Sequence, residues 1–307
     1  MDRPYILHMF TPGRQMSPFD INMAADAGYQ LVVPYADVGL AQIAGLTQDT
    51  IFSRGPKGVA RTGMFIGGRD ALLAADMLAA AEAAMVPPFV VSVMADPSGA
   101  YTTAAAMVAC VEAALLRQGV VDGLAGRRLV VLGGTGPVGR IAGVLAARAG
   151  ALVQLSSRNG VAVAEAAAQE TALRFGVPLQ GCSGADPAAV RHSIADAEVV
   201  LACAAAGKQV VSAQDLGAAH ALCVAADVNA VPPSGIAGVG VMDDAAPLAG
   251  AGSGQAVGIG ALAVGNVKYQ TQHRLLLQMR TADTPVALGF DAAFATARAF
   301  LAQRAAT

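Results

Sequence analysis

A glycine-rich segment at residues 129–139 has the residue types and the spacing of a phosphate-binding turn. The apolar run Leu129–Leu132 is followed by glycines at positions 134, 136 and 139, which form the pattern G-x-G-x-x-G. Between a strand and a helix, these glycines permit a tight turn, close approach of the backbone to a pyrophosphate, and helix–strand packing. The alternative is a glycine turn without a ligand. We predict that this turn binds a dinucleotide through Gly134, Thr135, Gly136, Pro137, Val138 and Gly139.

The next expected strand indicates which dinucleotide the turn would accept. A site for NAD carries Asp or Glu about 20 residues after the turn, bonded to the ribose hydroxyls. Here the strand ends in Ser156-Ser157-Arg158, without a carboxylate. Hydroxyl groups and a guanidinium can hold a 2′-phosphate through charge-assisted hydrogen bonds. Ser157 and Arg158 therefore predict a preference for NADP, or tolerance of both cofactors, unless Arg158 is simply a solvated side chain.

The remaining reactive residue types form no motif for acid–base, nucleophilic or metal chemistry. The histidines and cysteines are scattered and have no metal-ligand spacing, so no metal site is predicted. A hydride transfer that leaves a resonance-stabilised cation needs no strong general base, which fits this shortage. Lysine occurs only at positions 57, 208 and 268, and Lys268 lies in a polar cluster after a glycine-rich run. Lys268 is either a functional compact charge or an ordinary surface lysine.

Polar loops follow two of the other expected strands. Residues 96–103 follow the run 89–94, and residues 227–233 follow the run 221–226. Asp20, early in the first helix, belongs to the same edge by position. Ligands bind at the carboxyl ends of parallel strands, so these polar loops predict a cleft between two domains. The alternative for Asp227 is an Asx turn without a ligand.

The order of the expected elements indicates an α/β fold with parallel sheets. Short β-branched runs alternate with long Ala-rich runs, which is typical of βα units. The polar stretch Gly119–Arg128 separates two such series. We expect a substrate domain at 1–118, completed by 266–307, and a Rossmann-type dinucleotide-binding domain at 119–265. Strands are expected at 5–10, 31–34, 62–66, 89–94, 129–132, 152–155, 198–202 and 221–226, and helices at 17–27, 69–85, 102–118, 137–149, 161–175, 187–194, 266–279 and 291–305.

The composition excludes several classes of protein. Of the 307 residues, 55% are hydrophobic and 14% charged, which is not the balance of a disordered chain. A net charge of −2 without a basic run argues against nucleic-acid or membrane-surface binding. The uncharged run Ala245–Val267 is too rich in glycine for a membrane span, and the N-terminus lacks the pattern of a signal peptide. We expect a soluble cytoplasmic protein.

Five stretches, in order along the whole chain, resemble the methylene-tetrahydromethanopterin dehydrogenases of methylotrophic bacteria, in their NAD(P)-dependent branch specific for the methanopterin carrier. They are Met16–Ala24, Ser53-Arg54 with Arg61–Gly68, Ala95–Gly99 with Thr102–Ala105, Asp227–Gly238 and Gly258–Gln272.

The resemblance implies oxidation of N5,N10-methylene-tetrahydromethanopterin to the methenyl compound, with hydride transfer to NAD(P)+, in formaldehyde oxidation. It also implies a two-domain subunit with a pterin cleft, in a homo-oligomer (trimer or hexamer). By resemblance, Asp20, Asp96, Thr102 and Lys268 lie at the pterin, and the loop 227–233, including Asp227 and Asn229, lies near the nicotinamide. The alternatives are a methylene-tetrahydrofolate dehydrogenase, with or without cyclohydrolase activity, and a non-enzymic NADP-sensing module.

Overall fold

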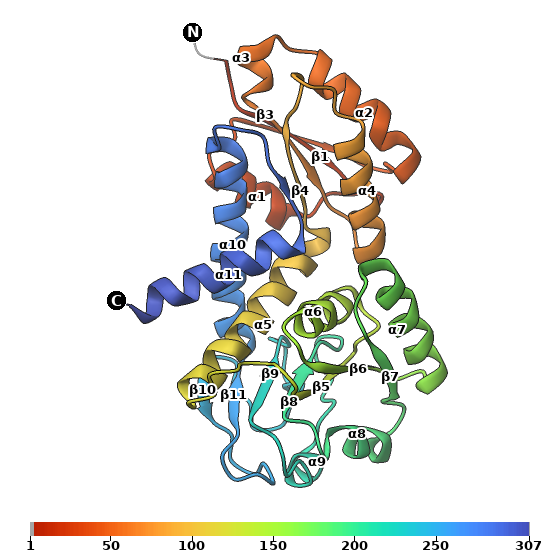
Figure 1. Cartoon of the computed structure of the whole chain (residues 1–307), viewed down its shortest axis with the longest axis vertical. Coiled ribbons are helices and arrows are strands. Elements are labelled where there is room, and N and C mark those ends of the chain that lie inside the picture. Colours follow the sequence, from red (N-terminus) through yellow and green to blue (C-terminus); the bar gives the residue numbers. More distant parts are fainter. Residues whose placement is uncertain (1–2, 307) are drawn as a thin grey trace. The chain divides into compact units, whose positions relative to one another are not determined.

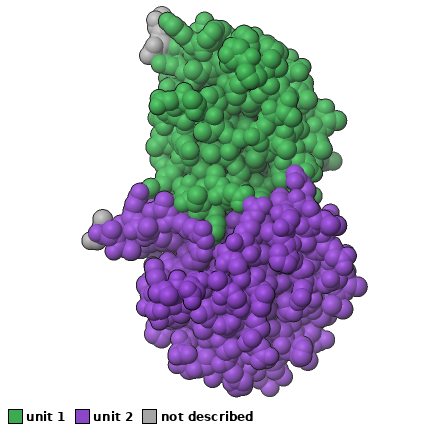
Figure 2. Space-filling view, viewed as in Figure 1, with its two compact units in different colours: residues 1–102, 269–296 green, residues 103–268, 297–307 purple. Residues whose placement is uncertain are grey.

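The computed structural model describes residues 3–306, and the chain divides into two compact units (Figure 2). Unit 1 comprises residues 1–102 and 269–296, and unit 2 comprises residues 103–268 and 297–307. The divisions fall within three helices: α5 (Ala100–Arg117), α10 (Ala261–Thr281) and α11 (Phe290–Ala305). The assignment of one domain to the pterin and one to the dinucleotide stays a prediction.

Unit 1 contains a five-stranded sheet in the order β12-β4-β3-β1-β2, and every pairing in it is parallel. Since the strand order reverses between β1 and β3, the carboxyl ends of these two strands form the switch point at which such sheets bind ligands. Figure 1 shows α1 on one face of this sheet and α2 and α4 on the other. The strands are β1 (Ile6–Phe10), β2 (Leu31–Tyr35), β3 (Thr62–Ile66), β4 (Ser92–Ala95) and β12 (Ala287–Leu288), and the helices of this part are α1 (Pro18–Asp26), α2 (Leu40–Phe52), α3 (Pro56–Val59) and α4 (Ala71–Ala83).

Local sequence signals explain much of unit 1. All residues of β3 and β4 are buried, as expected for central parallel strands covered on both faces. Strand β2 lies at the edge of the sheet, where Pro34 is tolerated. Helix α1 begins at Pro18 after Ser17 and ends before Gly28, whose φ of 91° requires a residue without a side chain. These boundaries agree with the sequence-based expectation.

Unit 2 contains a seven-stranded sheet in the order β10-β11-β9-β8-β5-β6-β7, in which only β10 is antiparallel. Apart from β10, this is the doubly wound order of a Rossmann fold. Helices α6 and α7 cover one face, and α8 and α9 the other (Figure 1). The strands are β5 (Arg128–Leu132), β6 (Leu152–Ser157), β7 (Gln180–Ser183), β8 (Val199–Ala202), β9 (Val224–Asp227), β10 (Asp244–Pro247) and β11 (Val257–Ile259), and the helices are α6 (Pro137–Arg148), α7 (Val161–Phe175), α8 (Pro187–Ile194) and α9 (Ala213–Gly217). The expected α/β class with parallel sheets is confirmed.

Several elements were not indicated by the sequence pattern. Helix α2 is one of them; its first residues are capped by the Gln42 side chain, which accepts from the Gly39 N–H at 2.7 Å. The short strands β7, β10, β11 and β12 and the short helices α3 and α9 are others. Helix α10 begins at Ala261, inside the run expected to be a loop, and it therefore contains Gly265. Strand β4 starts three residues later than expected, at Ser92.

Within residues 3–306, one helix is long and apolar enough to cross a membrane, by length and composition alone. It covers residues 97–117, and 78% of its most apolar window is buried inside the fold. Burial of this extent is typical of a core helix. The glycine-rich run 245–267 instead contains β10, β11 and the start of α10.

Candidate active site

The glycine turn joins β5 to α6, as its spacing predicts. The Gly134 N–H donates to the Ser156 carbonyl at 2.9 Å, which fastens the turn to the neighbouring strand β6. A Cβ on Gly134 would lie 2.8 Å from the Leu155 Cα, and one on Gly139 would lie 2.6 Å from the Gly133 carbonyl oxygen. The first and third glycines of the motif are therefore required by close backbone packing.

The start of α6 meets the requirements of a pyrophosphate site. Gly136 is the N-cap, Pro137 the first helical residue, and Val138 and Gly139 follow in the first turn. The first N–H groups of a helix have no partner within it, and the positive end of its dipole attracts anions. A Cβ on Gly136 would meet only the Gly133 carbonyl oxygen, at 3.4 Å, so this glycine leaves room for a ligand rather than for packing. The residues present fit a dinucleotide.

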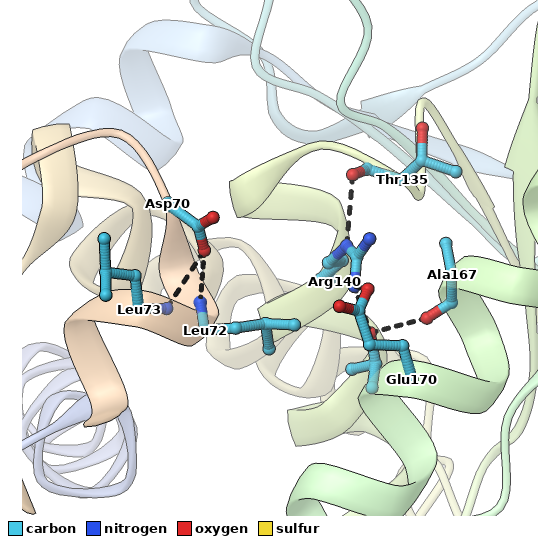
Figure 3. A network of polar contacts seen from close by, with 8 residues as sticks. Asp70, Leu72, Leu73, Thr135, Arg140, Ala167 and Glu170 are labelled. Carbon is cyan, nitrogen blue, oxygen red and sulfur yellow. Dashed lines mark hydrogen bonds and ion pairs between the residues drawn. The ribbon is translucent and has the colours of Figure 1, made fainter.

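Arg140 anchors this turn, and sequence reasoning did not single it out. Its Nε donates to the Thr135 carbonyl at 3.2 Å, and its Nη1 contacts the Glu170 carboxylate at 2.6 Å (Figure 3). The same Nη1 also contacts the Thr171 hydroxyl at 3.0 Å. Glu170 and Thr171 belong to α7. Arg140 therefore fixes the main chain of the turn to the next helix of unit 2.

At the end of β6, the two residues expected at the adenosine ribose have different environments. Ser157 is buried, and its hydroxyl accepts from the Asn159 N–H at 3.2 Å. Arg158 is exposed, and its guanidinium makes no hydrogen bond or ion pair within residues 3–306. The Gly134 N–H is hydrogen-bonded to the end of this same strand, so Arg158 follows a segment that is held against the glycine turn. An uncommitted guanidinium there fits a 2′-phosphate.

The carboxylate of Asp227, at the end of β9, organises the loop that follows. Oδ1 accepts from the Asn229 N–H at 2.9 Å, and Oδ2 accepts from the N–H groups of Gly235 at 2.6 Å and Ile236 at 3.1 Å. Burial raises the pKa of this carboxyl, although the three backbone donors oppose that rise. Asp227 is 2% exposed, and its carboxylate holds the two ends of the loop together.

Asn229 connects the loops after β8 and β9. Its Oδ1 accepts from the N–H groups of Gly207 and Val231, both at 3.0 Å, and its Nδ2 donates to the Pro233 carbonyl at 2.8 Å. A pocket of about 240 Å³ lies here and is lined by Asp227, Asn229 and neighbouring loop residues. Burial raises the pKa of the nearby Cys203 thiol to about 12, so a nucleophilic thiolate is not supported at neutral pH.

In unit 1, Asp20 is held by a residue far away in the sequence. Asp20 lies in the first turn of α1 and is 2% exposed, and its Oδ1 accepts from the Gln272 Nε2 at 2.6 Å. Gln272 is fully buried on α10. Lys268 precedes it by four residues on the same helix, so the two side chains belong to one face of α10. Lys268 is half-buried and therefore differs from the exposed Lys57 and Lys208. Sequence reasoning selected Lys268 and Asp20 but missed Gln272.

The two other residues expected at the pterin, Asp96 and Thr102, are paired with each other. The Thr102 hydroxyl donates to Asp96 Oδ2 at 2.6 Å, and Asp96 Oδ1 accepts from the N–H groups of Tyr101 and Thr102 at 2.9 and 3.2 Å. Both residues are 0% exposed. Asp96 follows β4 and caps the first turn of α5 across the short helical turn Pro97–Gly99. Their role at the pterin stays a prediction.

This pairing predicts a stability effect. Thr102→Val keeps the side-chain shape but leaves a buried carboxylate oxygen without its hydroxyl donor. We expect a loss of roughly 1–3 kcal/mol of unfolding free energy, seen as a lower midpoint of urea unfolding. Thr103→Val is the matched control, since the half-buried Thr103 makes no side-chain hydrogen bond within residues 3–306. Equal midpoints for the two variants would contradict the assigned role.

A pocket of about 690 Å³ lies at the switch point of the unit 1 sheet. It is formed by the loops that follow β1 and β3 and by the start of α1, and Asp20 and Ser98 line it. Asp70, also on its wall, is the N-cap of α4, and its Oδ1 accepts from the N–H groups of Leu72 and Leu73 at 2.9 and 3.0 Å (Figure 3). Of the four residues expected at the pterin, only Asp20 lines this pocket.

Comparisons of the sequence with known proteins give matches along most of the chain. Residues 18–98 match the family model described as methylene-tetrahydromethanopterin dehydrogenase, N-terminal. The chain is 48% identical over 289 residues to an NAD(P)-dependent methylenetetrahydromethanopterin dehydrogenase of Methylorubrum extorquens, covering 94% of this chain and 96% of that protein. It is 32% identical over 257 residues to the bifunctional protein MdtA of the same organism, covering 84% and 87%.

Solved structures with similar folds come from more distant proteins. A shikimate 5-dehydrogenase of Listeria monocytogenes, in complex with shikimate and NAD, superposes with a TM-score of 0.52 at 14% identity, covering 92% of this chain and 93% of that one. A quinate dehydrogenase of Corynebacterium glutamicum gives 0.51 at 12% identity, covering 97% and 99%. These likenesses concern the fold. The sequence identity confirms the resemblance stated above: the chain belongs to the methylene-tetrahydromethanopterin dehydrogenase family.

Proposed function

We propose that this protein oxidises N5,N10-methylene-tetrahydromethanopterin to the methenyl compound, with NAD(P)+ as the hydride acceptor. The observation that carries the proposal is the 48% identity, over 94% of the chain, to a relative named for this activity. The glycine turn, with its packing requirements at Gly134 and Gly139, supports the dinucleotide half of the proposal independently of that name.

The chemistry matches the scarcity of acid–base groups. The methylene carbon lies between two nitrogens, so loss of a hydride leaves a cation that both nitrogens stabilise. No proton has to be removed in this step, and the protein's task is to orient the reacting carbon and to tune the charge around it. We propose that Asp20, fixed by Gln272, accepts hydrogen bonds from the pterin ring, and that Lys268 donates to the ring and orients it.

The chain's own residues would hold the cofactor along the carboxyl edge of the unit 2 sheet. The first-turn N–H groups of α6 bind the pyrophosphate, and Arg140 keeps the Thr135 backbone in place. Arg158 contacts the adenosine ribose. The loop tied down by Asp227 and Asn229 borders the nicotinamide. When bound, NAD(P)+ supplies the electrophilic carbon that accepts the hydride.

Two further expectations follow from family membership. We propose that the protein works in the cytoplasm in formaldehyde oxidation, and that it is a homo-oligomer, either a trimer or a hexamer. Light scattering of the purified protein distinguishes these states, because the particle mass is then three or six times the 30.7 kDa of the chain.

Steady-state kinetics with two carriers and two cofactors tests the proposal. We expect formation of NAD(P)H, followed at 340 nm, when the methylene form of tetrahydromethanopterin is supplied. A higher kcat/KM with methylene-tetrahydrofolate would instead favour a folate enzyme. Tight binding of NADP without any pterin-dependent turnover would favour a non-enzymic sensing module.

A further inference from the structure

Two arginines on the wall of the unit 1 pocket have no partner inside the protein. Arg14 and Arg69 line the pocket of about 690 Å³, and both are exposed. Neither guanidinium makes a hydrogen bond, an ion pair or a stacking contact within residues 3–306. Other arginines of the chain, such as Arg127, Arg128 and Arg298, are bound to carbonyls or carboxylates. Two uncommitted guanidinium groups on one pocket leave it able to accept an anion.

The segments that carry these arginines are held in place by the backbone. The Gly13 carbonyl accepts from the Asp37 N–H at 3.0 Å, and the Gly13 N–H donates to the Thr11 hydroxyl at 3.1 Å. On the other side, the Ser98 hydroxyl donates to the Gly68 carbonyl at 2.7 Å. Arg14 and Arg69 directly follow these anchored glycines. Their backbones are therefore fixed, while their side chains remain available.

Each carboxylate of the same pocket accepts hydrogen bonds from the protein through its Oδ1, whereas the two guanidiniums make none within residues 3–306. Asp20 accepts from Gln272, and Asp70 accepts from two N–H groups at the start of α4. Neither lies within ion-pair distance of Arg14 or Arg69. The pocket thus combines a buried acceptor, Asp20, with exposed cationic groups. A ligand that matches both features has a ring with hydrogen-bond donors and an arm with acidic groups.

We propose that Arg14 and Arg69 bind the acidic groups on the side arm of the reduced pterin carrier and so contribute to carrier selection. This inference rests on the proposed function, because that function supplies a donor-bearing pterin ring for Asp20. A guanidinium fork binds carboxylate and phosphate groups in the same bidentate way, so the recognised chemistry is the oxyanion of the arm. The two arginines are contacts to the substrate remote from the reacting carbon.

The test pairs protein variants with a truncated substrate. The variants are Arg14→Gln, Arg69→Gln and their combination, with Lys57→Gln as a control that removes an exposed charge of unit 1 outside the pocket. The truncated carrier keeps the pterin and the arylamine nitrogen but ends before the first acidic group. With the full carrier, we expect each single variant to raise KM about tenfold at unchanged kcat, because each loses a hydrogen bond to a charged group. With the truncated carrier, wild type and variants should have the same KM.

Several outcomes would overturn the inference. An unchanged KM for the full carrier in the double variant contradicts it and leaves the proposed function intact. An equal rise in KM for the full and truncated carriers also contradicts it, since the arginines would then act on the ring or on the fold. If wild type does not turn over the carrier, the proposed function fails. Calorimetric binding of the full carrier then decides the inference by itself, because affinities that do not differ between wild type and the double variant contradict it.

Discussion

Replacing Lys268 with alanine is expected to lower kcat about 100-fold or more, since removal of one preorganised donor at a developing charge has an effect of this size. Lys268 is half-buried on α10, one helical turn before the glutamine that binds Asp20. A compact ammonium group can donate to a pterin carbonyl from such a position. The measurement is single-turnover kinetics with saturating carrier and cofactor.

Two controls separate a catalytic effect from a structural one. Lys57→Ala removes a lysine from the exposed surface of α3 and should keep the wild-type rate. Lys268→Arg keeps the positive charge but replaces the compact ammonium group by a planar guanidinium. Its rate should therefore lie between those of wild type and Lys268→Ala. If Lys268→Ala turns over at the wild-type rate, the residue is an ordinary surface lysine and the pterin ring is oriented by other groups.

The parts of the site that could be predicted from the sequence depend on local geometry. The turn at residues 133–139 is defined by glycine spacing and by the strand and helix on either side, and all of these are adjacent in the chain. The same holds for the start of α1, where Pro18 follows Ser17 and Gly28 ends the segment. In both places the backbone conformation permits only certain residue types. The local structure can therefore be predicted from the residue pattern.

Contacts between distant segments could not be predicted in this way. Gln272 lies 252 positions after Asp20, and nothing local distinguishes it from a surface glutamine. The local sequence around Arg140 likewise does not indicate its contacts with Thr135 and Glu170. The two arginines of the unit 1 pocket follow different strands, β1 and β3, and only the parallel sheet brings these loops to one edge. Sequence patterns can place a single residue at the carboxyl edge of a sheet. Which of these residues line the same pocket depends on the strand order of the folded protein.

The second large effect concerns the cofactor. Arg158→Ala is expected to raise the KM for NADP about 10- to 100-fold and to leave the KM for NAD nearly unchanged, since a hydrogen bond to a charged group contributes about 1.5–3 kcal/mol. The reason is that Arg158 has no partner within residues 3–306 and follows Ser157, whose strand carries the bond to Gly134. The same change should weaken binding of 2′,5′-ADP, measured by calorimetry, and should leave binding of 5′-AMP unchanged.

The comparison of the two nucleotides makes this result independent of turnover. Arg174→Ala is the control, because Arg174 is an exposed arginine in the last turn of α7, at the far end of the helix that follows Arg158. A variant that loses affinity equally for both nucleotides would indicate damage to the turn rather than loss of a phosphate contact. Wild-type protein that binds NAD much more tightly than NADP would contradict the assignment directly. In that case another acceptor for the ribose hydroxyls must replace the missing carboxylate at the end of β6, because the Ser156 and Ser157 carbonyls there already accept backbone hydrogen bonds.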